Sequence, residues 1–216
     1  MAQAAHKLGV PLVHISTDYV FDGTLDRPYA ESDPTGPTGV YGASKLAGEH
    51  AVLAIHADNS AIVRVAWVYS PFGANFVKTM LRLAADRDEV GVVADQVGNP
   101  TSALDIADGI IQVVTNLVSD SSLGLRGVFH MTAQGEASWA DFAGAIFAAS
   151  AARGGPSARV RRISTADYPT PATRPVNSRL DCGLIAKVHG LALPDWRRSL
   201  EGVIDRLQPA QENNDA

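Results

Sequence analysis

The sequence is marked first by what it lacks. One cysteine, Cys182, occurs among 216 residues, so no disulfide can form within the chain. No run of about 18 apolar residues is present, so no membrane-spanning helix is predicted. Residues 1–9 have no apolar stretch of signal-peptide length. These absences favour a cytoplasmic protein, because disulfides and export signals are typical of secreted ones.

Charge of one sign is also scarce. The formal net charge is −5, which gives no electrostatic reason to expect a nucleic acid or an anionic membrane as a partner. The six histidines show no spacing typical of metal ligands, so we expect no metal site. What remains is a sequence that is 46% hydrophobic and 19% charged, a composition that can bury a substantial core.

Short apolar runs alternate with segments of helical periodicity along the chain. Strands are predicted at residues 10–16, 61–69, 90–94, 127–132 and 159–163. Helices are predicted at residues 41–55, 75–85, 103–117, 138–152, 182–188 and 195–207. Ser138 and Asp141 predict a capping box. The alternation predicts an α/β fold with a doubly wound parallel sheet, in which ligands bind beyond the carboxyl ends of the strands. The long loop at residues 22–39 suggests a functional role.

Three side chains offer acid–base chemistry. Thr17 follows the first strand, and Tyr41 and Lys45 lie one turn apart on one face of the next helix. A free phenol has a pKa of about 10, and a neighbouring ammonium lowers that pKa by favouring the phenolate. The pair can therefore act as an acid and base, with Thr17 bonding the phenol or a substrate oxygen. The same spacing also occurs in surface pairs that have no function.

Three further residues each have two interpretations. Asp18 could cap the turn after the first strand or accept a sugar hydroxyl. Trp67, at the end of the second strand, could belong to the core or stack on a sugar face. Arg174, in a proline-rich loop, could bind a phosphate bidentately or form a surface salt bridge. Because parallel strands end at the same rim, we expect Thr17 and Trp67 to lie near each other.

These residues belong to longer segments that resemble a known family. The segments are Ser-Thr-Asp-Tyr-Val-Phe-Asp-Gly at 16–23, Tyr-Gly-Ala-Ser-Lys-Leu-Ala-Gly-Glu at 41–49, Arg-Val-Ala-Trp-Val-Tyr at 64–69, Asn-Phe-Val-Lys-Thr-Met at 75–80, Asp-Gln-Val-Gly-Asn-Pro-Thr at 95–101 and Arg-Pro-Val-Asn-Ser at 174–178. In this order they resemble the extended short-chain dehydrogenase/reductases, and among these the dTDP-4-dehydrorhamnose reductases. The resemblance covers nearly the whole chain, to about residue 207.

The resemblance implies an NAD(P)H-dependent oxidoreductase that reduces the C4 keto group of dTDP-4-dehydro-L-rhamnose to give dTDP-L-rhamnose, a polysaccharide precursor. It implies Thr17, Tyr41 and Lys45 as catalytic residues, with Tyr41 and Lys45 also contacting the cofactor, NADPH or NADH. It implies Thr17, Asp18 and Trp67 as contacts of the nucleotide sugar, and it is compatible with a homodimer. Two alternatives stay open: a nucleotide-sugar epimerase or dehydratase of the same superfamily, and a non-catalytic binding protein resembling the regulatory subunit of methionine adenosyltransferase.

The sequence departs from the family in one respect. A full member begins with a strand, a glycine-rich dinucleotide turn and a helix, and no such unit precedes the first predicted strand here. We therefore expect residues 1–100 to be the carboxyl-terminal part of a Rossmann-like domain that carries the catalytic residues. Residues 101–207 would form the substrate-binding region, and 208–216 a disordered tail. Because those glycines let the backbone approach the pyrophosphate, we expect weak cofactor binding and impaired activity of this chain.

Overall fold

A three-stranded parallel sheet forms the centre of the first lobe. The computed structural model describes residues 1–168 and 174–208. The strands lie side by side in the order β1 (Leu12–Thr17), β2 (Ser60–Val65) and β7 (Gly127–His130). Thr17 pairs with Val65, and Arg64 pairs with His130, so the carboxyl ends of the three strands meet at one rim. The sheet confirms the prediction of an α/β fold with parallel strands.

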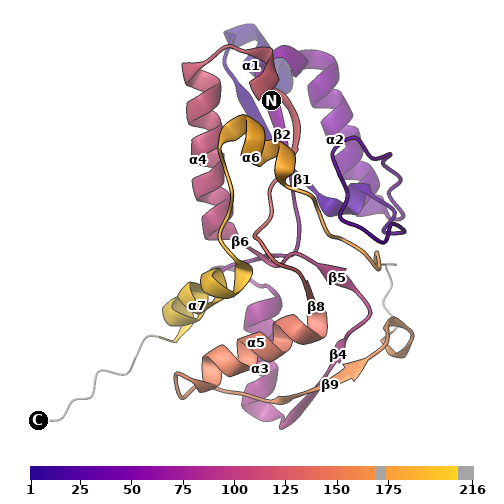
Figure 1. Ribbon diagram of the computed structural model, residues 1–216, viewed down its shortest axis with the longest axis vertical. Helices are drawn as coiled ribbons and strands as arrows, with labels where there is room; N and C mark the ends of the chain where they lie inside the picture. Colours follow the sequence, from indigo (N-terminus) through magenta and orange to yellow (C-terminus); the bar gives the residue numbers. More distant parts are fainter. Residues whose placement is uncertain (169–173, 209–216) are drawn as a thin grey trace, which may run out of the picture.

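Helices cover both faces of this sheet (Figure 1). One face carries α1 (Ala2–Leu8) and α2 (Val40–His56), and the other carries α4 (Ala103–Ser119) and α6 (Gly183–His189). Successive side chains of β2 point to opposite faces: Val63 belongs to the apolar cluster that includes Val113 of α4, whereas Arg64 bonds Glu49 of α2. Every residue of β2 is buried because both faces of this strand are covered.

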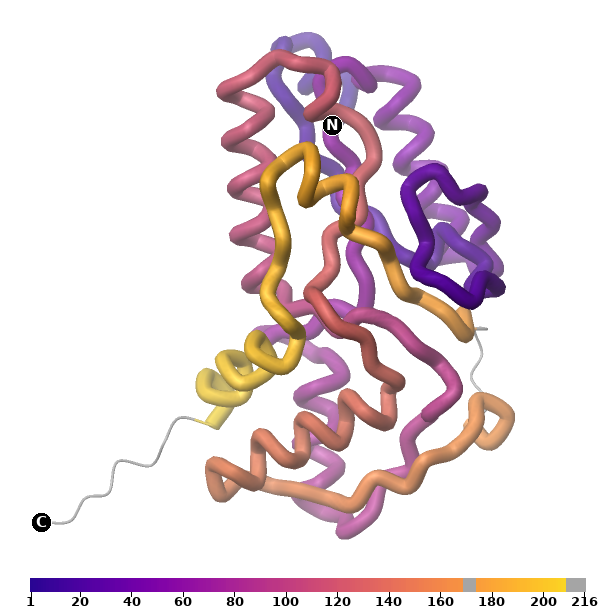
Figure 2. Tube along the Cα trace, in the orientation of Figure 1, coloured from indigo at the N-terminus to yellow at the C-terminus, as the bar shows by residue number. Residues whose placement is uncertain are grey.

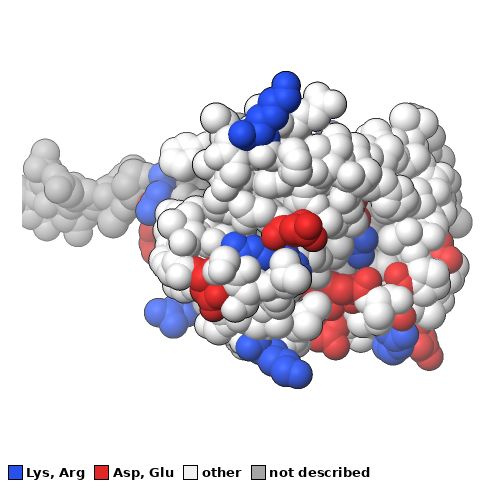
Figure 3. Space-filling model, turned by 90° about the horizontal axis from the view of Figure 1, so that it is seen from above, with Lys and Arg blue, Asp and Glu red and all other residues white. Residues whose placement is uncertain are grey.

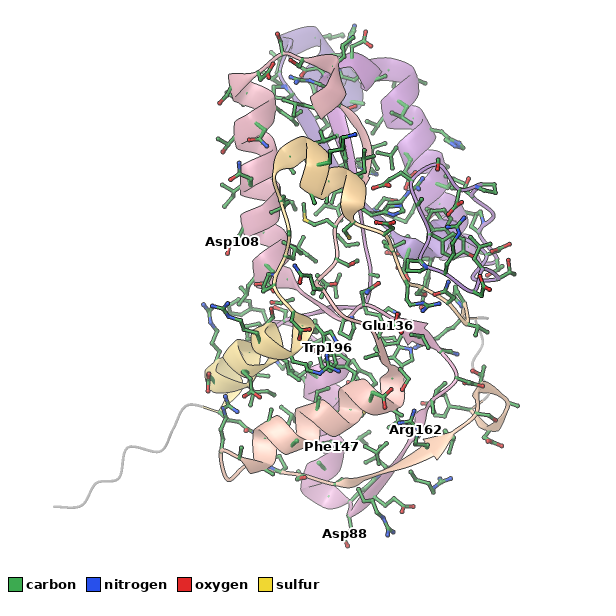
Figure 4. The ribbon with its side chains drawn as sticks, in the orientation of Figure 1. Asp88, Asp108, Glu136, Phe147, Arg162 and Trp196 are labelled. Carbon is green, nitrogen blue, oxygen red and sulfur yellow. The ribbon has the colours of Figure 1, made fainter. Side chains whose placement is uncertain are left out.

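The second lobe packs helices against a smaller pair of strands. Its elements are α3 (Phe76–Asp86), β4 (Glu89–Val93), α5 (Trp139–Ala151), β9 (Arg159–Ile163) and α7 (Trp196–Leu207). β4 and β9 pair in parallel. The core is apolar and includes Phe142, Phe147 and Trp196, of which the last two are marked on α5 and at the start of α7 in Figure 4. The predicted capping box is confirmed, since Ser138 and Asp141 exchange hydrogen bonds at the start of α5.

Two short ladders connect the lobes. They are β3 (Val68–Tyr69) with β6 (Thr101–Ser102), and β5 (Val97–Gly98) with β8 (Ala137–Ser138). A continuous strand was expected at residues 61–69, and this expectation is wrong. β2 ends at Val65, and Trp67 takes a left-handed backbone conformation with φ of 45°. The strand ends there because the chain leaves the sheet and enters the second lobe.

The chain passes between the lobes more than once. α3 and β4 precede residue 100 and pack in the second lobe, whereas α4 and β7 follow residue 100 and complete the first. The packing thus groups the elements differently from the expected division at residue 100, because neighbours in the fold are distant in the sequence. Of the expected tail, Gln208 donates a hydrogen bond to Ser150 at 2.9 Å, and residues 209–216 lie outside the described part of the chain.

Charged side chains are scattered over the surface. On the face shown in Figure 3, acidic and basic groups occur near one another, and much of the surface between them is uncharged. Within residues 1–168 and 174–208, no helix combines the length and apolar character that a bilayer crossing requires. The same residues contain no group of three or more His, Cys, Asp or Glu side chains that could hold a metal ion.

Candidate active site

A cleft of about 990 Å³ opens where the rim of the first sheet faces the second lobe. Its walls include all six side chains that the sequence singled out: Thr17, Asp18, Tyr41, Lys45, Trp67 and Arg174. The first-lobe wall carries Thr17, Asp18, Tyr41 and Lys45. The second-lobe wall combines apolar side chains such as Phe76 and Met80 with polar ones, which are Thr79, Arg82, Arg87 and Gln96. The structure therefore brings together residues that come from a strand end, a helix and two loops.

Thr17 and Asp18 form the end of β1. The Thr17 hydroxyl donates to the Asp18 carboxylate at 2.9 Å and accepts the Tyr19 backbone N–H at 3.3 Å, which caps a short 3-10 turn, η1 (Asp18–Val20). Asp18 is only 5% exposed, and this burial raises the pKa of its carboxyl to about 6 against the opposing effect of the Thr17 bond. The carboxyl can therefore exchange a proton near neutral pH, where most carboxyls cannot.

Gly42 allows α2, which carries Tyr41 and Lys45, to approach the end of β1. A Cβ at this position would lie 2.0 Å from the Tyr19 carbonyl oxygen, so only glycine fits between α2 and η1. This close approach sets the Tyr41 ring against the Tyr19 ring, edge to face, with 5.9 Å between centroids. Tyr41 remains 56% exposed on the cleft wall. A phenol is thus held beside the turn that Thr17 begins.

Lys45 lies one helical turn beyond Tyr41 on the same wall. Its Nζ donates a hydrogen bond to the Ile15 carbonyl oxygen at 2.5 Å, so α2 is attached directly to β1. The ammonium also affects His14, whose pKa is lowered first by burial and then by this positive charge. Thr17, Tyr41 and Lys45 therefore occupy one wall of one cleft, and their catalytic roles stay predictions.

Trp67 is enclosed on both faces of its indole. One face stacks on Trp139, with 3.5 Å between ring centroids and an interplanar angle of 7°. A Cβ on Gly98 would lie 2.5 Å from Trp67 Cε2 and 2.6 Å from Nε1, which places Gly98 over the ring. Gly98 must cover the opposite face, because Trp139 fills the first. Trp67 therefore presents an edge to the cleft, and the face-on sugar stacking considered from the sequence has no room in this conformation.

Sequence reasoning missed several residues that line the cleft. Trp139 was predicted only as part of the helix at residues 138–152. Phe76 packs on Trp139 with 4.6 Å between centroids and lines the same wall, as does Tyr168. The spacing of these residues carries no signal, because each comes from a different element. Trp67, on this wall, has a positive φ of 45°, a strained conformation for a residue other than glycine.

The long loop at residues 22–39 is anchored to the segment that carries Arg174 (Figure 2). Tyr29 forms a bridge with Leu180, and the Asn177 amide donates to the Leu25 and Arg27 carbonyl oxygens at 2.9 and 2.7 Å. Arg174 lies at the start of this segment and its charge opposes the burial that raises the pKa of Tyr19. The loop therefore holds Arg174 at the cleft, where its role as an anion ligand stays a prediction.

Gly36, Gly39 and Gly42 have the spacing Gly-x-x-Gly-x-x-Gly, but they do not form a dinucleotide turn. Such a turn joins a strand directly to a helix, whereas η1 and the long loop separate β1 from these glycines. The Tyr19 carbonyl oxygen occupies the space beside the Gly42 Cα, so no space is left there for a phosphate. These three glycines therefore provide no dinucleotide loop.

The first-lobe wall fits the nicotinamide ribose of a dinucleotide. An ammonium has three donors, and one Lys45 donor is held by the Ile15 carbonyl, so the others are free to bond ribose hydroxyls. Ile15 is 44% exposed beside it and offers an apolar surface to a ring. Lys45 and Tyr41 would hold the cofactor here.

Comparisons with known proteins identify the family of this chain. A family model described as the RmlD substrate binding domain matches residues 1–209. A dTDP-4-dehydrorhamnose reductase of Sinorhizobium fredii is 50% identical over 204 residues, which are 94% of this chain and 69% of the relative. The chain belongs to the dTDP-4-dehydrorhamnose reductase family. Its members are NAD(P)-dependent oxidoreductases, and this chain spans about two thirds of their length.

Solved reductase structures share the fold. That from Clostridium acetobutylicum matches with a TM-score of 0.87 and 40% identity, covering 96% of this chain and 69% of the other. The reductase from Bacillus anthracis in complex with NADP matches with a TM-score of 0.85 and 37% identity, covering 94% and 68%. Nucleotide-sugar dehydratases and an epimerase match at 14–20% identity, which shows the fold alone. The reductase family is thus favoured over the alternatives.

Proposed function

We propose that the cleft reduces the C4 keto group of dTDP-4-dehydro-L-rhamnose to give dTDP-L-rhamnose. The observation that carries this proposal is the placement of Thr17, Tyr41 and Lys45 on one wall of the cleft. The names of the relatives supply the substrate class, a dTDP-linked keto sugar. The reaction needs a proton donor at the carbonyl oxygen and a hydride donor at the carbonyl carbon.

Tyr41 is the proton donor in this proposal. Its hydroxyl is exposed in the cleft, where a carbonyl oxygen can reach it, and its ring is fixed by Tyr19 and by the close approach at Gly42. Thr17 donates to the same carbonyl oxygen once its hydroxyl hydrogen turns away from Asp18, to which it is bonded in the structure. Lys45 stabilises the phenolate that remains after proton transfer, by its positive charge.

NADPH or NADH, when bound, supplies the hydride. Lys45 and Tyr41 orient the ribose beside the reacting carbon, and Ile15 excludes water from the ring. The NADP complex of the related Bacillus anthracis reductase supports this class of cofactor. We expect this chain to bind the cofactor weakly, because no glycine-rich turn follows a strand in the described residues.

The sugar nucleotide occupies the side of the cleft between the lobes. Asp18 accepts a sugar hydroxyl, and Trp67 contacts the sugar through the edge of its indole. Phe76, Met80 and Trp139 give an apolar surface on the opposite wall that suits a nucleoside. Cytoplasmic location and a homodimer complete the proposal, the former because the nucleotide substrate and the reduced cofactor are both intracellular metabolites.

A Tyr41→Phe variant tests the proton donor. We expect the rate of NADPH-dependent reduction to fall on the order of a hundredfold or more, the usual share of acid catalysis, with little change in substrate binding. Tyr168→Phe is the matched control, because Tyr168 is 57% exposed on the same cleft. Near-normal turnover by the Tyr41 variant would show that another group donates the proton.

Cofactor binding is measured first, by fluorescence titration with NADPH. The chain alone is compared with a fusion in which an upstream segment with a strand, a glycine-rich turn and a helix, as the family resemblance implies, precedes residue 1. We expect the fusion to bind much more tightly and to support the kinetic comparison of the two tyrosine variants. Equal, tight binding by both proteins would contradict the expectation of weak binding.

A further inference from the structure

A buried ion pair connects α2, which carries Tyr41 and Lys45, to the neighbouring strand β2. Glu49 of α2 accepts two hydrogen bonds from Arg64 of β2, Nε to Oε1 at 3.0 Å and Nη2 to Oε2 at 2.6 Å. The two side chains are only 2% and 5% exposed. The Ser16 hydroxyl of β1 donates to the same Glu49 carboxylate. One carboxylate thus joins α2 to two neighbouring strands of the sheet.

The position of Glu49 on α2 relates it to the proposed catalytic residues. Glu49 lies one turn beyond Lys45, which lies one turn beyond Tyr41, so the three share one side of the helix. Lys45 bonds the Ile15 carbonyl, and Glu49 bonds the next residue of β1, Ser16. The helix is therefore attached to successive residues of the strand that ends in Thr17. A shift of α2 along β1 would break both attachments together.

The same pair also fixes the turn after β1. The Arg64 guanidinium lies over the Phe21 ring, 5.0 Å from its centroid, and Phe21 stacks on Tyr29 with 4.2 Å between centroids. Phe21 directly follows η1, which carries Asp18. Arg64 consequently contacts Glu49 on the helix that bears Tyr41, and Phe21 next to the turn that bears Asp18.

We propose that Glu49 is a positioning residue for this site, acting with Ser16 and Arg64 to set the height and rotation of α2 over the end of β1. The proposal rests on the proposed function, since it assigns Glu49 a role in placing Tyr41 and Lys45. A buried ion pair costs desolvation of two charges, and apolar residues of similar volume often stabilise a fold as well or better. What the pair supplies is a defined geometry. While the free donors of Lys45 bond a ribose, the Glu49 contacts hold the helix in place.

Two serines allow a matched test. Ser16 and Ser60 are both buried, and each hydroxyl links α2 to the sheet: Ser16 bonds Glu49, whereas Ser60 donates to the His56 carbonyl at 2.7 Å, at the far end of the helix. Ser16→Ala and Ser60→Ala therefore remove similar bonds from opposite ends of α2. Amide hydrogen exchange by mass spectrometry and NADPH-dependent turnover are measured for both.

We expect Ser16→Ala to speed exchange of the amides of residues 43–49 about fivefold, the effect of one hydrogen bond. Ser60→Ala should speed exchange only near residues 52–56. Turnover by Ser16→Ala should fall about tenfold with KM for the sugar nucleotide nearly unchanged, because misplaced catalytic groups affect the chemical step. Ser60→Ala should leave both constants unchanged. If the amides of residues 43–49 exchange at the wild-type rate in Ser16→Ala, the proposal is wrong.

A second variant separates positioning from stability. In Glu49→Met with Arg64→Met, no buried charge is left unpaired, so we expect thermal stability to be close to that of the wild type. Turnover should remain at least tenfold low, because an apolar pair has no directional bonds. If this double variant has the turnover of the wild type as well as its thermal stability, the ion pair has a merely structural role.

The two proposals fail in different ways. If the fusion protein shows no reductase activity, the proposed function is wrong, but the exchange pattern of the two serine variants still decides whether Glu49 holds α2. If activity is present and the exchange pattern is absent, the reductase assignment stands and the positioning role does not.

Discussion

The two lobes differ in where they place their charges. In the first lobe, Asp18, Glu49 and Arg64 are all nearly inaccessible to water and lie next to the cleft. In the second lobe, the buried cluster is apolar, and ion pairs such as Arg162–Asp141 lie at the surface, with side chains 56% and 49% exposed. Both lobes pack helices on strands, but the first buries charged side chains and the second has an apolar buried cluster.

The difference shows how stability and chemistry are divided. Apolar burial is non-directional and supplies most of the free energy of folding, which suits the second lobe as one wall of a cleft. Hydrogen bonds and ion pairs are directional but costly to bury, so they are justified where a side chain must be held in one orientation. The three buried charges lie within the structure that carries Thr17, Tyr41 and Lys45.

The largest expected effect comes from breaking the buried pair. Glu49→Gln leaves Arg64 without a countercharge, and we expect a loss of about 3–5 kcal/mol in the free energy of unfolding. Glu89→Gln, the same change in the second lobe, removes partly exposed pairs with Arg159 and Arg161 and should cost less than about 1 kcal/mol. Urea denaturation of both variants checks this contrast, and equal losses would refute it.

A second expectation concerns pH within the first lobe. Burial, with the charge of Arg64, lowers the pKa of His130 to about 4, so its contribution to stability is present above the unfolded value of 6.5 and lost as pH falls through 4. Burial raises the pKa of Asp18 from 3.8 to about 6, so its contribution is present at low pH and lost as pH rises from 3.8 to 6. Each amounts to about 3 kcal/mol, and the two oppose each other.

Single variants should reveal these opposing effects. Asp18→Asn should make the protein lose about 3 kcal/mol more than the wild type between pH 6.5 and pH 4, because only the His130 effect remains. His130→Gln should produce the reverse difference over the same range. Urea denaturation at a series of pH values measures both, and parallel pH profiles for wild type and variants would rule out either shift.

The smallest expected effect concerns two glycines. A Cβ on Gly98 would enter the Trp67 ring, so Gly98→Ala should displace the indole and cost about 1–3 kcal/mol. Gly144, on α5, has no atom within 4 Å of an added Cβ, and Gly144→Ala should stabilise by about 0.5–1 kcal/mol. Melting temperatures give the signs. Loss of the exciton band of the Trp67–Trp139 stack in circular dichroism should accompany Gly98→Ala alone, and its retention there would contradict the assigned packing.

Local features of the fold were predictable from the sequence. The bounds of β9, the capping box of Ser138 and Asp141, and the placement of Tyr41 and Lys45 on one face of a helix all depend on residues a few positions apart. Helical and strand periodicity, and the preferences of capping residues, act over such distances. The family segments added the order of the site residues, and with it the reductase assignment.

Tertiary structure alone decided the rest, because those features join residues that no local pattern connects. The stacking of Trp67 on Trp139, and the cover that Gly98 gives its other face, depend on how β5 pairs with β8. Glu49 stood within a predicted segment, but its partners Arg64 and Ser16 are fixed by the order of β1 and β2 in the sheet. The chain therefore determined by itself which groups could react, and packing determined how they are held.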